Sequence, residues 1–463
     1  MLLNGVLCVL FRQKKIILCA TNQRSKYTFL RTMNPIIGHF FYLCPMCFSL
    51  HRTLYSSSIW ICCLLCLMAS SLVIVGGSTD AGPATQISLL TASPGEELYS
   101  SFGHSAIRIR DTIAGIDRVF NYGTFDFDTP NFYGKFIRGN LNYRLSVASF
   151  DSFLENYRYE ERAVYEQSLA LNQAECQAVM DFLVENYKPQ NRYYRYDFFF
   201  DNCATRIRDL FELVLNNRLK WHFEDSSRRF SPDTPPSTFR QLVDQCTRHR
   251  YWADFGIDLM LGAKTDRLAQ PREYLFLPDY LQKAFGKATL TDSTGIDRPL
   301  VAQTRQLLYA QLLHPAPFWQ GPTVVFSTCA VLVMLLSIWA RRKKRELTNF
   351  DRLLFGSTGF LGWFLLFCWF GTSHSVLVNN WNLVWAFPLH LPVALLALRQ
   401  QPRFNVWRKW YFGLSVIVLL TASFSWVLFP QIYHPAVSSL IFILLFRSIV
   451  NWETAVKKKT AAT

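Results

Sequence analysis

The residues most suited to chemistry lie between Tyr196 and Phe211, in the sequence YDFFFDNCATRIRDLF. After Asp201 and Asn202 comes Cys203, followed by apolar residues spaced i, i+3, i+4, i+7 and i+8: Ile207, Leu210, Phe211, Val214 and Leu215. This spacing predicts a helix with Asp201 or Asn202 as its N-cap. Cys203 would lie in the first turn, where unpaired backbone N–H groups favour a thiolate. The alternative is a buried structural cysteine that opens an ordinary helix.

A thiol nucleophile needs a base, most often histidine, and a group that orients the base. His104 follows Gly103 at the start of a predicted strand, where its side chain can point into a cleft. Asn121, on the next predicted strand, is the expected orienting residue. The alternatives for this third role are Tyr122, Asp126 and Asp128. The histidines expected to lie at the surface or in packing positions are His222, His249 and His314.

The elements that must position these residues are strands followed by helices. Strands are expected near 85–91, 101–110 and 118–127, and helices near 149–157, 172–187 and after Cys203. This order favours an α+β domain over 85–320. Residues 219–316 are expected to add helical packing around the same core.

The exported region contains three cysteines, Cys176, Cys203 and Cys246. An odd number in an oxidising compartment indicates a free thiol or an intermolecular bridge. A disulfide between Cys176 and Cys246 would leave Cys203 free, although sequence does not establish the pairing.

The C-terminal third predicts a membrane domain over 321–451 and a basic cytoplasmic tail over 452–463. Apolar runs of nearly membrane-spanning length cover 322–340, 353–371, 381–398, 410–429 and 435–450. Basic residues follow the first run, separate the third from the fourth, and follow the last. By the positive-inside rule these basic segments are cytoplasmic, so the exported domain shares the outer side with the two uncharged loops.

The uncharged loops carry polar residues that favour a site for a polar lipid head group. The expected substrate-binding residues are His374, Asn380, Asn382 and His434, with Asn379 beside them. The alternative for each is an ordinary interfacial position at the end of a span.

Charge and hydropathy place the chain at a membrane rather than on nucleic acid. The net charge of +15 divides into +7 over 1–57, +11 over 341–463 and about −3 between them. The soluble part therefore has no basic surface for a phosphate backbone. We interpret 1–57 as an over-extended start or a basic N-terminal region without its own fold, and 58–84 as a signal peptide or signal anchor.

Three sequence blocks resemble the Lnb lipoprotein N-acyltransferases of Bacteroidota. They are FGHSAIRI (102–109), FNYGTFDF (120–127) and FFFDNCATR (198–206), and the later GIDLMLG (256–262) and the apolar tail fit as well. The resemblance covers about 85–450. It implies a circularly permuted, NlpC-type papain-like fold outside the cytoplasm, in which a histidine strand precedes a cysteine helix, followed by five spans in the inner membrane.

The resemblance also implies the reaction and its partners. A phospholipid would donate an acyl chain through a Cys203 thioester to the α-amine of a diacylglyceryl-cysteine lipoprotein, with His104 as base and no metal or cofactor. One alternative is a membrane-anchored papain-like peptidase or amidase that acts on cell-wall peptides. The other is a non-enzymatic protein in which Cys203 is structural.

Overall fold

The computed structural model describes residues 85–126, 128–223, 230–231, 233–310, 316–397, 404–424 and 429–460. The expectations for 1–57, for 58–84 and for His314 lie outside these residues.

The exported domain is built on one antiparallel sheet in the order β10-β5-β1-β2-β3-β4-β6. Its strands are β1 (Thr85–Ala92), β2 (His104–Asp111), β3 (Ile116–Thr124), β4 (Asn142–Ser149), β5 (Val164–Leu169), β6 (Tyr193–Arg195) and β10 (Val301–Leu308). The three strands predicted from sequence are confirmed as β1, β2 and β3. They form the centre of the sheet because their alternate residues are apolar and both faces are covered.

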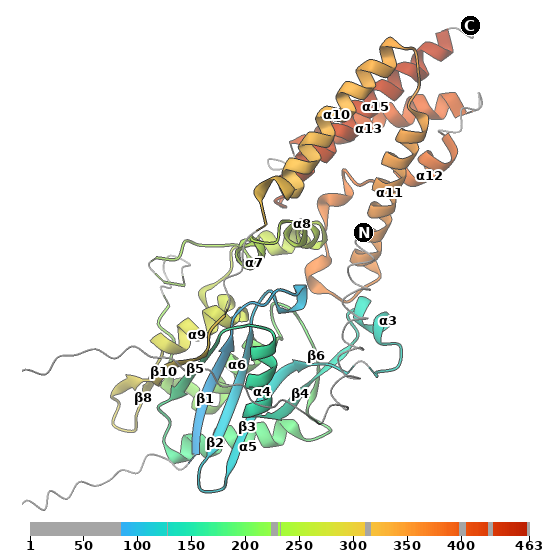
Figure 1. The fold of residues 1–463 in the computed structure, drawn as a ribbon. Coiled ribbons are helices and arrows are strands. Elements are labelled where there is room, and N and C mark those ends of the chain that lie inside the picture. The colour runs from blue at the N-terminus through green and yellow to red at the C-terminus, as the bar shows by residue number, and fades with distance from the viewer. Residues whose placement is uncertain are drawn as a thin grey trace, which may run out of the picture. The chain divides into compact units, whose positions relative to one another are not determined.

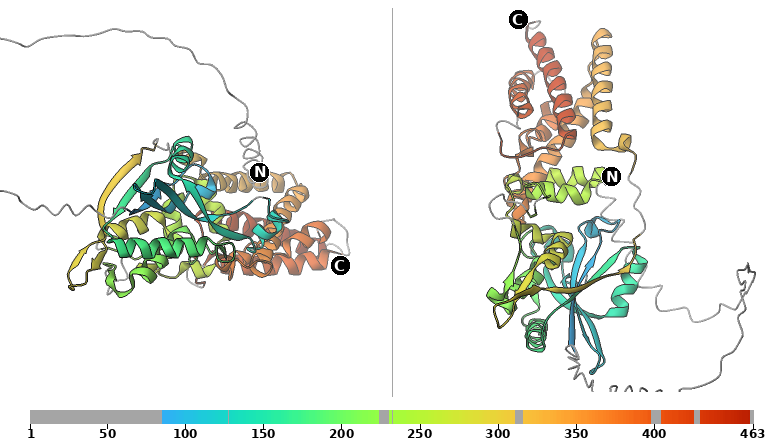
Figure 2. Two further views of the ribbon diagram at one scale, coloured as in Figure 1. Left: turned by 90° about the horizontal axis from the view of Figure 1, so that it is seen from below. Right: turned by 90° about the vertical axis from the view of Figure 1, so that its left-hand side faces the viewer.

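Helices cover both faces of the sheet (Figures 1 and 2). On one face, α4 (Phe150–Tyr159) packs against Ala106 and Val119 through Phe153. On the other face, α5 (Gln173–Tyr187), α6 (Cys203–Leu215) and α9 (Pro278–Lys287) enclose the larger core. The short helix α3 (Phe132–Ile137) connects β3 to β4. The domain is therefore α+β, as predicted, and the expected helices became α4, α5 and α6.

The segment after α6 corrects the prediction of purely helical packing. It does contain α7 (Phe239–Thr247), α8 (Tyr251–Met260) and α9, but it also forms a small sheet of β7 (Leu219–Lys220), β8 (Thr289–Thr291) and β9 (Asp297–Pro299). β10 then returns to pair with β5 in the main sheet. The strands were missed because their partners lie far away in sequence, which local apolar periodicity does not reveal.

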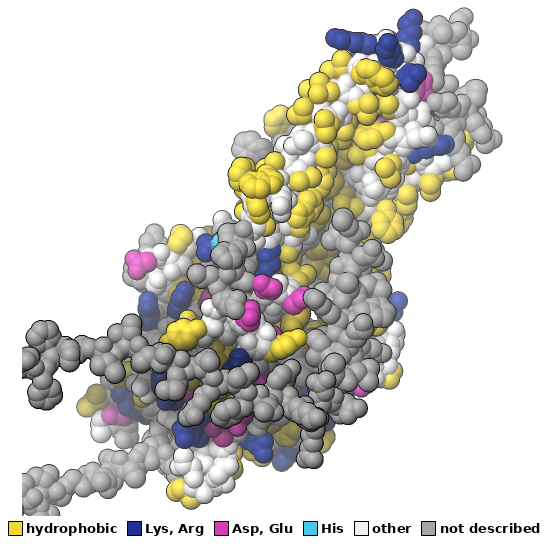
Figure 3. Space-filling view, viewed as in Figure 1, with side chains coloured by type: hydrophobic (Ala, Val, Ile, Leu, Met, Phe, Trp, Pro, Cys, Tyr) yellow, Lys and Arg dark blue, Asp and Glu magenta, His cyan; other side chains and the backbone are white. Residues whose placement is uncertain are grey.

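Three helices in the described part of the chain are long and apolar enough to cross a membrane. They are α10 (Pro322–Arg342), α11 (Thr348–Phe370) and the first 22 residues of α15 (Ala436–Thr460). Figure 3 shows hydrophobic side chains over the surface of these helices and Lys and Arg side chains at one end. Large exposed residues of α10, among them Leu332 and Leu335, form part of this apolar surface. Three of the five predicted spans are thus confirmed as single helices.

The third predicted span, 381–398, is not one continuous helix. Its described residues form η8 (Trp381–Leu383), α12 (His390–Pro392) and the π-helical turn η9 (Val393–Ala397). Pro388 and Pro392 explain the interruption, because proline removes a backbone donor and clashes with the preceding turn. The fourth run contains α13 (Asn405–Ser423), whose first turns include Arg408 and Lys409 and are therefore less apolar.

The interrupted segment packs directly on α11. Cβ atoms added to Gly359 and Gly362 would come within 2.1 Å of Leu391 N and 2.0 Å of Ala386 O. Only glycine permits such an approach of two backbones, as at many helix contacts within membranes. The membrane region is therefore held together by small residues as well as by its apolar core.

Candidate active site

The start of α6 is fixed by Asn202, which is the N-cap. Its Oδ1 accepts hydrogen bonds from the N–H groups of Ala204 and Thr205, both at 2.9 Å, and the Thr205 hydroxyl completes a capping box. The Asn202 amide nitrogen also donates to the carbonyls of Phe198 and Phe276. These bonds satisfy the orphan donors of the first turn and tie the helix start to a distant loop. Cys203 follows as the first residue of α6.

The Cys203 sulfur lies among backbone donors. Cys203 is 8% exposed, and the N–H groups of Ser105, Ala204 and Cys203 interact with its thiol. Gly123, with a φ of 85°, lies beside it, since a Cβ built there would be in ordinary van der Waals contact with the Cys203 Cβ at 3.8 Å. Burial raises the pKa of the thiol, whereas the N–H groups act in the opposite direction. The prediction of an easily ionised thiol was therefore wrong for the resting protein, because desolvation outweighs the helix terminus.

His104 and Asn121 form a hydrogen-bonded pair, with 3.3 Å between His104 Nε2 and Asn121 Oδ1. The Asn121 amide nitrogen in turn donates to the Val119 carbonyl, which orients Oδ1 toward the imidazole. Because Oδ1 only accepts, the proton of the neutral ring lies on Nε2 and Nδ1 keeps its lone pair. Burial lowers the pKa of His104 to about 4. The imidazole is therefore neutral at physiological pH.

His104 and the Ser105 N–H near the Cys203 sulfur occupy neighbouring positions at the start of β2. The ladder between β2 and β3 begins at Ile107, so the first residues of β2 extend beyond it. Backbone N–H groups point along the plane of a sheet, so the sulfur near the Ser105 N–H lies beside the strand. The His104 side chain lies on the face of the sheet covered by α4, because it is two residues before Ala106, which packs there. Among the described residues no hydrogen bond joins His104 to Cys203, and their closeness rests on adjacent positions along β2.

The side chains of Tyr122 and Asp126, two alternatives for the orienting residue, make hydrogen bonds elsewhere. The Tyr122 side chain faces the opposite core and donates its hydroxyl to Asn186 at 2.7 Å. The Asp126 carboxylate accepts from the backbone N–H of Asp128 in the turn after β3. Of the four residues considered, Asn121 is the one whose side chain bonds the imidazole.

Arg162 is a neighbour that the sequence reasoning missed. Ala92 pairs with His104 on one side and Val164 on the other, so Arg162, two residues before Val164, shares their end and face of the sheet. Its guanidinium is buried, donates to Ser93 O and Glu160, and lies 4.7 Å from the Tyr157 ring centroid. Its Nη2 is buried without a hydrogen-bond partner.

The positive charge of Arg162 acts on both predicted catalytic groups. It lowers the pKa of His104 and opposes the burial that raises the pKa of Cys203. The one sequence signal was an arginine two residues before a strand, and this arrangement is too common to indicate a site. Tertiary structure alone makes this arginine part of the site.

Asn380 and Asn382 cap the C-terminal end of helix α8. Both are 1% exposed, and both donate to the carbonyl of Leu259 in the last turn of α8. Gln431 donates to the next free carbonyl, that of Leu261. Helix C-termini leave such carbonyls unpaired, and here the membrane loops supply the donors. A lipid-binding role for the two asparagines stays a prediction, and their amides have protein partners.

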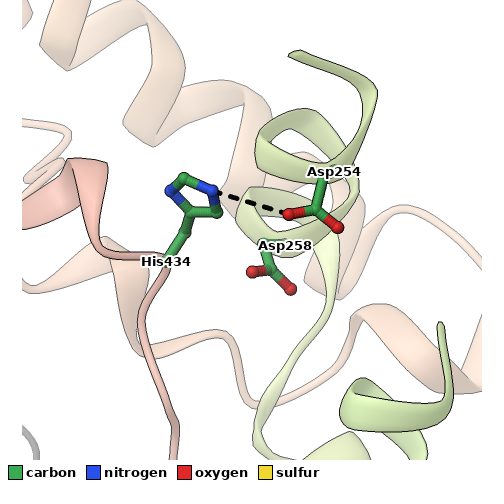
Figure 4. A group of neighbouring side chains, drawn as sticks. All are labelled: Asp254, Asp258 and His434. Atoms are coloured by element: carbon green, nitrogen blue, oxygen red, sulfur yellow. Dashed lines mark ion pairs between the residues drawn. The ribbon is translucent and has the colours of Figure 1, made fainter. Parts of the chain in front are cut away.

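His374 and His434 also contact the exported domain. His374 Nε2 lies 3.2 Å from the carbonyl of Phe136 in α3. His434 lies beside α8, where its Nε2 is 3.6 Å from Asp254 Oδ2 (Figure 4). The four predicted substrate-binding residues therefore lie at two places where loops of the membrane region meet the exported domain.

Asp254, Asp258 and His434 are close enough to be considered as metal ligands, with their ligand atoms within 4.8 Å of one another. The imidazole has the wrong tautomer for this role. His434 Nδ1 accepts the N–H of Ala436, so in the neutral ring the proton lies on Nε2, the atom facing Asp254. Asp258 is moreover paired with Arg240 at 2.8 Å. We therefore interpret the cluster as an ion-pair network.

The remaining cysteines of the exported domain are unpaired. Cys176 is buried in α5 and Cys246 is half-buried in α7, and both are free. The suggested disulfide between them is therefore absent. Burial raises the pKa of Cys176 to about 11 and that of Cys246 to about 12. Neither thiol has the N–H groups that surround Cys203.

Comparisons with known families agree with this division of the chain. The model of the Lnb N-terminal periplasmic domain matches residues 79–245, and the model of the Lnb transmembrane domain matches residues 316–459. No curated protein and no solved structure matched the chain. The two matched ranges cover about two thirds of the sequence and include Cys203, His104 and the three spans. The chain therefore belongs to the Lnb family and is a membrane protein with a periplasmic domain.

Proposed function

We propose that this chain is a lipoprotein N-acyltransferase that uses Cys203 as its nucleophile. The observation that carries the proposal is that a helix-start thiol lies among backbone N–H donors, one of them that of Ser105, next to His104, which pairs with Asn121. Membership of the Lnb family supports the choice of reaction. The three spans suit an enzyme whose two substrates are both anchored in a membrane.

In the first half-reaction, the Cys203 sulfur attacks the ester carbonyl of a phospholipid while its proton passes to His104 Nδ1. The N–H groups of Ser105 and Cys203 stabilise the oxyanion that forms. The C–O bond then breaks, and the proton moves from His104 to the departing glyceryl oxygen. The products are a Cys203 thioester and a lysophospholipid.

In the second half-reaction, the α-amine of a diacylglyceryl-cysteine lipoprotein attacks the thioester. Its proton passes to His104, the C–S bond breaks, and the proton returns to the sulfur. The product is an amide, and the free thiol is restored. The low pKa of His104 suits this step, because the imidazole is neutral before each transfer.

The proposed orientation places 85–320 as the acyltransferase domain on the periplasmic side of the inner membrane. The basic segment 341–345 at the end of α10 lies inside, so α11 ends outside at Phe370. The lysines at 457–459 near the end of α15 also lie inside, so α15 begins outside at Ala436. Both of these ends lie outside, so the chain between α11 and α15 crosses the membrane either not at all, which gives three spans, or twice, which gives five. Five spans and the permuted papain-like topology remain part of the proposal.

The test is to trap the intermediate. The full-length protein in vesicles that contain a phospholipid with labelled acyl chains should acquire label that neutral hydroxylamine releases. Cys203→Ala should abolish the labelling, whereas Cys176→Ala, which alters a buried thiol of the same domain, should retain it. Unchanged labelling of Cys203→Ala would refute the proposal. Cleavage of wall peptides without acyl transfer would favour the peptidase alternative.

A further inference from the structure

The short helix α3 presents an apolar face to solvent. Tyr133, Phe136 and Ile137 are 56%, 46% and 52% exposed, and their i, i+3, i+4 spacing places them on one side. Lys135 and Arg138 lie beside them, and no acidic residue occurs between Asp128 and Asp151. An exposed apolar and basic surface of this kind is typical of a helix that lies on a membrane.

The outer end of span α11 holds α3 at the level of the membrane surface. The Ser373 N–H donates to the Arg138 carbonyl at 2.8 Å, and His374 contacts the Phe136 carbonyl. Gly139, with a φ of 70°, permits the approach, because a Cβ there would lie 3.2 Å from the His374 ring.

The connection between the span and α3 is short. The last residue of α11 is Phe370, and three residues of extended chain reach about 10 Å at most. An interfacial helix lies with its apolar face roughly 5–10 Å deep at the boundary between head groups and acyl chains. Phe370 is 73% exposed and stacks on Trp369, as in an aromatic belt at the membrane surface.

A row of aromatic rings connects α3 to the nucleophile. Phe132 of α3 lies 5.8 Å from Phe125, which lies 5.4 Å from Tyr143, and Tyr143 stacks on Tyr196 at 4.5 Å. A Cβ added to Gly123 would touch the Tyr196 ring at 3.7 Å and the Cys203 Cβ at 3.8 Å. Tyr196, the last ring of the row, therefore lies close to Cys203.

We propose that α3 inserts its Tyr133, Phe136 and Ile137 face into the outer leaflet and that the aromatic row guides a lipid acyl chain from there toward Cys203. The partner is the phospholipid bilayer, with Lys135 and Arg138 at the lipid phosphates. The guiding role rests on the proposed acyltransferase function, whereas the insertion of α3 does not. The two parts can therefore be tested separately.

Insertion is tested with a photo-crosslinking residue, p-benzoylphenylalanine, in the full-length protein in phospholipid nanodiscs. It replaces Phe136 in one variant and Ile113 in the control, since Ile113 is 83% exposed in the turn between β2 and β3, remote from α3. After illumination, mass spectrometry should show about tenfold more lipid adduct at position 136. Equal yields, or cross-links at 136 to a second copy of the chain or to a protein substrate, would overturn the insertion.

Guidance is tested by acylation of Cys203. Phe125→Asp, which places a charge in the row and leaves the exposed face of α3 unchanged, should lower the ratio of thioester formed from phospholipid to that formed from the water-soluble ester p-nitrophenyl butyrate by about tenfold. Ile113→Asp should leave the ratio unchanged, and an unchanged ratio in Phe125→Asp would overturn the guiding role. If the wild-type protein forms no thioester, the proposed function fails, while the cross-linking still decides where α3 lies.

Discussion

Two regions of this protein bury polar side chains, and they use them differently. At the end of β2, Arg162 Nη2 is buried without a hydrogen-bond partner, and Nδ1 of the half-buried His104 has none among the described residues. At the membrane loops, the amides of Asn380 and Asn382 bond to carbonyls of α8, to the Asn382 N–H and to the Trp385 indole. Buried groups without partners are costly, so they usually mark function, whereas satisfied groups mark structure.

The largest effect is expected at the site with free atoms. His104→Ala should lower the rate of acyl transfer by about 10²–10⁴-fold, because the thiol and the amine lose their base. His222→Ala, which alters an exposed histidine bonded to Thr289, is the control and should remain active. Rates of lipoprotein acylation, measured by mass spectrometry of N-terminal peptides, check this. A fully active His104→Ala would mean that the end of β2 has no catalytic role and does not differ from the membrane loops in this respect.

The pH dependence sharpens the same prediction. Because the pKa of His104 is about 4, the acidic limb of kcat/KM should lie near pH 4 rather than near the ordinary 6.5. The unfolded chain binds this proton below about pH 6.5 and the folded protein does not, so stability should fall as the pH decreases from 6.5 toward 4. An acidic limb near 6.5 would mean that His104 is solvated or is not the base.

At the membrane loops, a loss of stability rather than of catalysis is expected. Asn380→Ala leaves the Met260 carbonyl of α8 without a donor and should lower the free energy of unfolding by about 1–3 kcal/mol. KM for phospholipid should not change. Asn142→Ala, at an exposed position of β4, is the control. A raised KM with unchanged thermal stability would restore Asn380 as a lipid-binding residue.

A smaller effect is expected for Arg162→Gln. Removing this charge should raise the pKa of the Cys203 thiol further and slow its alkylation by iodoacetamide at pH 7 by roughly tenfold. Arg158→Gln, an exposed position on α4, is the control. Arg162→Lys should recover part of the rate, because the charge is kept. Equal alkylation rates in Arg162→Gln and the wild type would make the arginine purely structural.

The smallest effect concerns the acidic network beside α8. Burial, with Asp258 and Asp254 nearby, raises the pKa of Asp244 to about 8. The folded protein therefore holds a proton that the unfolded chain releases, and stability falls as the pH rises from about 4 to 8. Asp244→Asn should raise the melting temperature at pH 8 by about 2–4 °C and change it little at pH 5. A lower melting temperature at pH 8 would contradict this assignment.

Much of the fold near the site could be predicted locally. The alternating residues of β1, β2 and β3 and the helical spacing after Cys203 identified the elements, and Asn202 was one of two suggested caps. β10 was missed because it pairs with β5 across more than 130 residues of sequence, from Val301 with Leu169 to Leu308 with Val164. The third span was expected as one helix because hydropathy counted its apolar residues, whereas Pro388 and Pro392 decide its backbone.

The sequence by itself determined the thiol at a helix start, the histidine at a strand start and the polarity of the membrane segments, because each depends on neighbouring residues. Tertiary structure decided the state of the thiol, the presence of Arg162 beside it and the partners of Asn380 and Asn382. These depend on desolvation and on contacts between distant segments. Local spacing carries no information about how much water a buried group loses, and that loss sets both reactivity and structural role.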